Sequence, residues 1–163
     1  MFAMIKRLLQ TTNDPVLTIV RLTLGVVFFA HGAQKALGWF GGYGFAGTLE
    51  GFSKMGVPVP LALFVVLTEF VGSLALISGV FARIASAAIL LLMAGAIATV
   101  HAQFGFYMNW FGQQKGEGFE YHLLAIGLAV AVLVRGAGAL SIDRLLLNNR
   151  RELNPAGTLN QTV

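Results

Sequence analysis

The chain has 163 residues, of which 56% are hydrophobic and only 11% are charged, and its formal net charge is +4. A soluble domain carries about 25% charged residues, so this composition excludes an ordinary water-soluble fold and indicates one membrane domain with room for about four spans. The absence of cysteine excludes disulfides, thiolate metal sites and thiol redox chemistry, and the basic residues flank apolar segments without a dense patch, which argues against a nucleic-acid partner.

The first predicted span covers residues 16–37, which are mostly apolar. Asp14 followed by Pro15 predicts its start, because Asp caps a helix N-terminus and Pro suits the first helical turn. His31 and Lys35 lie four residues apart near its end, so a helix places them on one face. We expect this segment to be retained and not cleaved, because its apolar run is long for a signal sequence.

A glycine-rich segment, residues 38–60, leads to the second predicted span, residues 61–80. Apolar residues recur at helical spacing within the glycine-rich segment, which predicts a short helix lying in the membrane interface. The second span is almost entirely apolar but carries Glu69 near its middle. A carboxylate at that depth costs at least ~2.5 kcal/mol unless it is neutralised or paired. Glu69 is therefore either a functional group or a neutral, hydrogen-bonded residue that joins helices.

Two further spans are predicted at residues 84–100 and 119–134. Only three residues separate the second span from the third, which predicts a tight antiparallel hairpin. His101 follows the third span directly, and the first turn of the fourth span carries Glu120. The connecting segment, residues 102–118, is polar and aromatic.

After the fourth span we expect a short surface helix at residues 140–147 and then a stretch without apolar periodicity. The predicted organisation is an N-terminal segment 1–15, a four-span membrane domain 16–147 and a flexible tail 148–163. The predicted fold class is all-α, a transmembrane four-helix bundle.

Basic residues predict the orientation of this bundle. Of the eleven lysines and arginines, only Lys35, Lys54 and Lys115 lie on the side opposite to both termini. Lys and Arg are enriched in cytoplasmic loops, so we expect cytoplasmic N and C termini in a multi-pass protein of the inner (plasma) membrane. Both tryptophans and all three tyrosines lie on the outer side, which favours a structured outer cap or a pocket roof.

On this topology every histidine and both carboxylates of the spans lie in the outer half of the membrane. A carboxylate beside an imidazole can relay protons, and near aromatic side chains such a pair suits a quinone, whose carbonyl oxygens accept hydrogen bonds from imidazole or ammonium groups. We therefore assign the proton-handling, catalytic role to Glu69 and His31. The predicted ligand-binding residues are Lys35, His101, Glu120, Trp39, Tyr107 and Trp110.

Helical phase distinguishes two neighbours on the fourth span. Glu120 aligns with the small residues Gly127 and Ala131, so we expect Glu120 to face the bundle and His122 to lie at its rim. We predict no metal site, because the His and carboxylate residues come singly from four helices without metal-binding spacing. A set of buried ion pairs that only holds the bundle together remains an alternative.

Three groups of residues form a pattern over residues 16–147. The first is Arg21, Leu22, Gly25, His31, Gly32 and Lys35, followed by Met55, Gly56, Val57 and Pro58. The second is Glu69, Gly72, Leu76, Gly79 and Arg83, followed by His101, Glu120, Tyr121 and Leu124. The third is residues 136–143, where Ala137 replaces a proline and Leu140 an aromatic of the matching signature. Together these groups resemble the DoxX family.

This resemblance implies a bacterial four-helix integral membrane protein in a family named after a subunit of a thiosulfate:quinone oxidoreductase. It implies functional polar positions at His31, Lys35, Glu69, Arg83, His101 and Glu120. Our hypothesis is a membrane subunit of a redox or detoxification system that binds a quinone or a similar small aromatic molecule. Its candidate partners are the lipid bilayer, a redox protein and a second copy of the chain.

Two other functions are compatible with the pattern. One is a non-catalytic membrane anchor or assembly subunit whose buried polar cluster is structural. The other is a transporter, which needs a polar route to the inner face. The third span offers only Ser86 and Thr99 between Arg83 and His101, so we do not favour a transporter.

Overall fold

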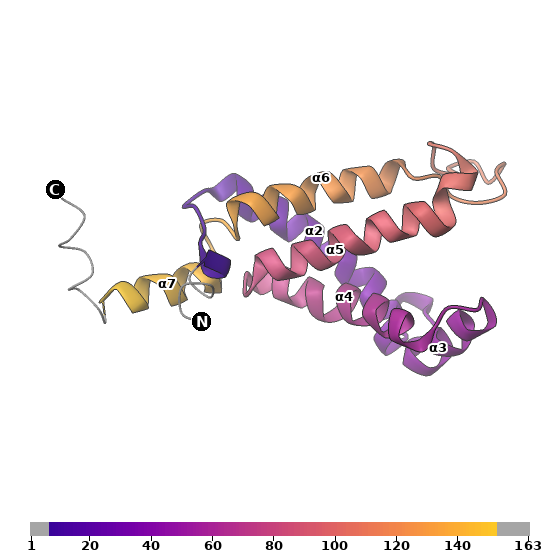
Figure 1. Cartoon of the computed structure of the whole chain (residues 1–163), viewed down its shortest axis with the longest axis horizontal. Coiled ribbons are helices and arrows are strands. Elements are labelled where there is room, and N and C mark those ends of the chain that lie inside the picture. Colours follow the sequence, from indigo (N-terminus) through magenta and orange to yellow (C-terminus); the bar gives the residue numbers. More distant parts are fainter. Residues whose placement is uncertain (1–6, 153–163) are drawn as a thin grey trace.

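A computed structural model describes residues 7–152, with side chains described for residues 7–148. Every regular element within this range is helical, which confirms the all-α prediction. The helices form an elongated assembly in which both ends of the described chain lie at the same end (Figure 1).

The first long helix, α2 (Pro15–Leu37), begins and ends as the sequence predicts. The Asp14 side chain accepts a hydrogen bond of 2.8 Å from the backbone N–H of Val16, and Pro15 occupies the first turn. Gly38 ends the helix in a left-handed conformation with φ of 74°, which favours glycine because it lacks Cβ.

The remaining helices also match the predicted order. A short 3-10 helix (Trp39–Gly41) precedes α3 (Gly44–Lys54), which is the predicted interfacial helix, and α4 (Val59–Ser78) carries Glu69. Helix α5 (Ala82–Ala96) continues through a π-helical turn (Ile97–His101) and a 3-10 turn (Ala102–Phe104). Helices α6 (Glu120–Arg135) and α7 (Ile142–Glu152) complete the described chain.

Three of these segments are long and apolar enough to cross a membrane. They are Pro15–Leu37, Val59–Ser78 and Ala82–Phe104. Helix α6 has 16 residues, fewer than the about 20 that a membrane-spanning helix needs. A fourth crossing by α6 therefore stays a prediction.

The four long helices pack as two pairs, α2 with α4 and α5 with α6. The pairs meet in a buried apolar core that includes Leu24, Phe28, Leu76, Ile89 and Val132. They lie close together near the short α4–α5 turn and diverge toward the opposite end, which carries α3 and the loop before α6 (Figure 1). The assembly therefore has a closed end and an open end.

Two buried charges hold the closed end together. Arg21 is 1% exposed, and its guanidinium donates to the carbonyl oxygens of Leu76 and Ile77 at the end of α4, and to those of Ala137 and Leu140 after α6. Arg21 belongs to the basic residues on the side of both termini, and the structure buries it. Its physical role is to join the end of α4 to the segment that follows α6, through backbone carbonyls of both.

Asp143 completes the closed end from α7. Its carboxylate accepts hydrogen bonds of 2.7 Å from the N–H of Phe81 and 3.1 Å from that of Ala82, at the start of α5. Burial raises the pKa of Asp143, while these two bonds and the nearby Arg21 oppose the rise. Gly138 lets the segment between α6 and α7 pack closely against α2, because a Cβ at this position would lie 2.6 Å from the backbone nitrogen of Thr18.

The last helix is longer than predicted. Helix α7 runs to Glu152, five residues beyond the predicted end of the surface helix at residue 147. The rest of the predicted tail, residues 153–163, lies outside the described residues.

Candidate functional site

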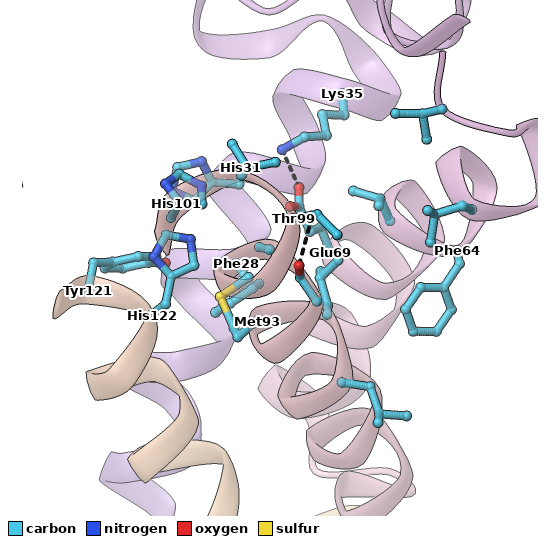
Figure 2. Close-up of a pocket in the computed structure, with 18 of the residues that line it drawn as sticks. Phe28, His31, Lys35, Phe64, Glu69, Met93, Thr99, His101, Tyr121 and His122 are labelled. Carbon is cyan, nitrogen blue, oxygen red and sulfur yellow. Dashed lines mark hydrogen bonds and ion pairs between the residues drawn. The ribbon is translucent and has the colours of Figure 1, made fainter. Parts of the chain in front are cut away.

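A cavity of about 450 Å³ lies at the open end, between the two helix pairs (Figure 2). Most of its wall is apolar and comes from α2, α4 and α5, with Phe28, Phe64 and Met93 among the larger side chains. Its titratable lining residues are His31, Lys35, Glu69, His101, Glu117, Tyr121 and His122. Four of the predicted site residues therefore meet at one cavity: His31, Lys35, Glu69 and His101.

An ion pair occupies the α2–α4 side of the cavity. The Lys35 Nζ atom lies 2.5 Å from a carboxylate oxygen of Glu69, which is 7% exposed. Gly32 makes this approach possible, because a Cβ on Gly32 would lie 2.5 Å from the backbone carbonyl of Glu69. Lys35 follows Gly32 by one helical turn and so reaches the carboxylate. The partner of Glu69 is thus Lys35, not His31 as the sequence suggested.

Three histidines and a tyrosine gather on the opposite side. The ring centroids of His101 and His122 are 4.0 Å apart, and those of His31 and Tyr121 are 6.4 Å apart. His101 lies at the end of the π-helical turn, where its Nδ1 atom is 2.8 Å from the carbonyl oxygen of Glu117. These rings connect α2, the end of α5 and the start of α6.

Two buried polar atoms in this group lack a hydrogen-bond partner among the described residues. They are the hydroxyl oxygen of Tyr121 and the Nδ1 atom of His122. Both residues line the cavity. Buried polar atoms are nearly always hydrogen-bonded, so two unpartnered atoms on residues of the cavity wall single out this part of the wall as a candidate place for a ligand or ordered water.

The face of α6 that packs inward differs from the predicted one. The buried residues are His122, Ala125, Ala129 and Val132, whereas Gly127 is exposed. The prediction that His122 lies at the rim is therefore wrong. The packing helices use the alanines, which follow His122 at helical spacing, and not the small residues in phase with Glu120.

Glu120 has a different environment from the one predicted. One of its carboxylate oxygens accepts hydrogen bonds of 2.9 Å from the N–H of Met108 and 3.2 Å from the indole N–H of Trp110. Glu120 does not line the cavity, although Met108 does. Its observed contacts tie the loop before α6 to the start of that helix.

The predicted aromatic roof also lies away from the cavity. Trp39 packs edge-on against Phe29, with ring centroids 6.4 Å apart, and Tyr107 packs against Phe106. Trp110 is 79% exposed. The cavity wall near α3 and the loop before α6 is formed instead by Phe52, Val57 and Met108.

The arrangement provides hydrogen-bond donors beside an apolar space. Lysine, tyrosine and histidine can donate to a ligand carbonyl, and the Lys35–Glu69 pair and the histidines can exchange protons. Within residues 7–148, no group of three or more His, Asp or Glu side chains is arranged to hold a metal ion.

Known proteins match most of the chain. The DoxX family model matches residues 16–102. The protein named "Putative oxidoreductase CatD" of Bacillus subtilis (strain 168) is 26% identical over 136 residues, covering 83% of this chain and 90% of that protein. "Inner membrane protein YqjF" of Escherichia coli (strain K12) is 30% identical over 138 residues, covering 85% of this chain and 97% of that protein.

No solved structure matches the chain. The family match, the bacterial relatives and the three long apolar helices together make this a bacterial membrane protein. Because the family model covers more than half of the sequence, the chain belongs to the DoxX family.

Proposed function

We propose that the protein is a membrane subunit of a redox system that binds a quinone, or a similar small aromatic molecule, in the cavity at the open end. The observation that carries the proposal is an apolar cavity whose wall holds a Lys–Glu ion pair together with Tyr121 and His122, two residues that each bury a polar atom without a partner among the described residues. A volume of about 450 Å³ is within the range of small-molecule sites, which bind mainly through apolar walls and a few polar groups.

In this proposal the quinone ring lies among the apolar side chains, and its two carbonyl oxygens accept hydrogen bonds. Tyr121 donates to one carbonyl, and Lys35 or His122 donates to the other. Reduction of a quinone to a quinol takes up two electrons and two protons. A redox partner protein supplies the electrons, and Glu69 and His31 pass the protons.

The relatives favour a redox role in part. One of them carries the word oxidoreductase in its name, and another is named as an inner membrane protein. We extend the redox role and the inner (plasma) membrane location to this chain as proposals. The distribution of basic residues adds the orientation: both termini lie in the cytoplasm, so the cavity opens in the outer half of the membrane.

The test is quinone binding by the purified protein in lipid nanodiscs. Glu69→Gln keeps the size of the side chain but removes the charge that pairs with Lys35. We expect the mutant to bind a short-tailed quinone about fivefold more weakly. Glu50→Gln is the matched control, because Glu50 forms an exposed ion pair with Lys54 on α3. Equal affinities of wild type and Glu69→Gln would remove Glu69 from the binding site.

The second candidate is a non-catalytic anchor or assembly subunit. The observation in its favour is that Glu69 and Lys35 already satisfy each other, as a structural ion pair does. This alternative predicts that Glu69→Ala lowers the thermal stability and that the wild type binds no quinone. A partner protein, or a second copy of the chain, then co-purifies with the wild type and is lost from the mutant.

A further inference from the structure

The cavity has two sides where the helix pairs meet, and these two sides are bounded differently. On the α2–α6 side, the rings of His31 and Tyr121 lie 6.4 Å apart and connect the helix pairs. On the α4–α5 side, no hydrogen bond and no aromatic pair joins the two helices within the described part of the chain. Figure 1 shows α4 and α5 diverging from their short turn toward the cavity end.

The residues that border the α4–α5 side are apolar and accessible. Leu61 of α4 is 50% exposed and Leu91 of α5 is 64% exposed, and both line the cavity. Gly95 of α5 and Thr99 of the π-helical turn follow Leu91 at intervals of four residues, so the three form one stripe that is both cavity wall and outer surface.

Two details keep this stripe open and apolar. A Cβ on Gly95 would meet no atom within 4 Å, so the space beside this residue is free. The Thr99 hydroxyl donates to the carbonyl oxygen of Gly95 at 2.8 Å, so its hydrogen is already used by the backbone. Since α4 and α5 are candidate membrane spans, their exposed apolar residues face lipid chains.

The polar and apolar ends of the cavity are also separated. Figure 2 shows His31, His101, His122 and Tyr121 on one side, the Lys35–Glu69 pair in the middle, and Phe64 on the opposite side. A ligand with a polar ring and a long apolar chain matches this order. A ligand that is polar all round does not.

We propose that the cavity opens between α4 and α5 into the hydrocarbon core of the membrane, and that its ligand is a lipid-soluble ring compound whose apolar tail leaves through this opening. This inference rests on the proposed function and specifies its substrate class: a tailed membrane quinone, not a small water-soluble aromatic. The ring lies beside the Lys35–Glu69 pair and the tail passes the stripe on α5, where it replaces contacts with lipid chains.

The test compares two probes at one fixed detergent concentration: a dimethoxy-methyl-benzoquinone with a decyl tail, and the same ring without the tail. Gly95→Phe adds a large apolar side chain to the cavity wall at the opening, where a Cβ meets no atom within 4 Å. We expect it to weaken equilibrium binding of the tailed quinone at least about fivefold and that of the tailless ring less than about twofold. Gly95→Leu, a smaller change, gives the same selective loss if the phenylalanine variant does not fold.

Gly127→Phe is the control variant. Gly127 lies on α6, does not line the cavity, and a Cβ there also meets no atom within 4 Å, so both substitutions add the same surface to a membrane helix. We expect this control to bind both probes as the wild type does. If Gly95→Phe and Gly95→Leu leave the preference for the tailed quinone unchanged, the opening is refuted while the binding site stands. If the wild type binds neither probe, the proposed function fails as well.

Discussion

The two ends of the helix assembly bury polar groups in opposite ways. At the closed end, Arg21 and Asp143 use backbone carbonyl and N–H groups of distant segments of the chain as partners. At the open end, Tyr121 and His122 each bury a polar atom without a partner in the described structure, beside a cavity. A buried charge surrounded by backbone partners joins helices, whereas an unpartnered polar atom beside free space is suited to a molecule that binds later.

The largest expected effect is at the closed end. Arg21→Met removes four hydrogen bonds to carbonyl oxygens and leaves those carbonyls buried. We expect the free energy of unfolding to fall by about 3–5 kcal/mol. Denaturant unfolding in detergent measures the loss. Arg135→Met, a change at an exposed residue at the end of α6, is the control and should alter stability little.

Asp143→Ala should have the next largest effect. It leaves the N–H groups of Phe81 and Ala82 without their acceptor at the start of α5. We expect a loss of about 1–3 kcal/mol, together with faster hydrogen exchange of these two amides. Unchanged exchange at both amides would show that other groups or water replace the carboxylate.

His122→Phe should act in the opposite direction. It removes a buried nitrogen without a partner and adds apolar surface next to an apolar cavity. We expect a gain in stability of about 1 kcal/mol and weaker quinone binding, as is common when a functional site is optimised for stability. His101→Phe is the comparison: it breaks the bond to the Glu117 carbonyl and should not stabilise the protein. If His122→Phe is less stable than the wild type, His122 stabilises the fold as Arg21 and Asp143 do.

The smallest expected effect is that of Glu120→Ala. The carboxylate holds the loop through Met108 and Trp110, outside both buried clusters. We expect a loss of no more than about 1 kcal/mol and a change in the fluorescence of Trp110, whose indole loses its acceptor. A large drop in the melting temperature would mean that the loop supports the whole open end.

The elements of the fold were predictable because local signals determine them. The Asp14 cap, Pro15, the glycine after α2 and the long apolar runs each act within a few residues of the chain. The burial of Arg21 has no such signal, since its partners lie between 55 and 119 residues further along. Its position within an apolar span was the clue, the same one that singled out Glu69.

For the candidate site, the sequence predicted the depth of the residues in the membrane but not which face of α6 points inward. Placing polar residues at one level of the membrane brought His31, Lys35, Glu69 and His101 together at the cavity. Small residues alone did not identify the inward face of α6, because small residues also occur on exposed faces such as that of Gly127. Ala125 and Ala129, in phase with His122, carried the correct signal.

Tyr121 was missed for a related reason. It belongs to the family pattern, but a tyrosine in the first turn of a span reads as an interfacial anchor. Its place in the cavity wall, and its buried hydroxyl oxygen without a partner among the described residues, distinguish it from an anchor.

The bonds of Arg21 have a consequence for the order in which the chain is made. A ribosome produces α2 long before the carbonyls of Ala137 and Leu140 exist. During that interval the arginine is a cation without its final partners, so we expect α2 to stay near the membrane surface or to bind an insertion factor until the last residues emerge. In a nascent chain stopped before residue 137, we therefore expect α2 to be incompletely inserted. Synthesis of the following segment should then allow α2 to insert stably into the bilayer.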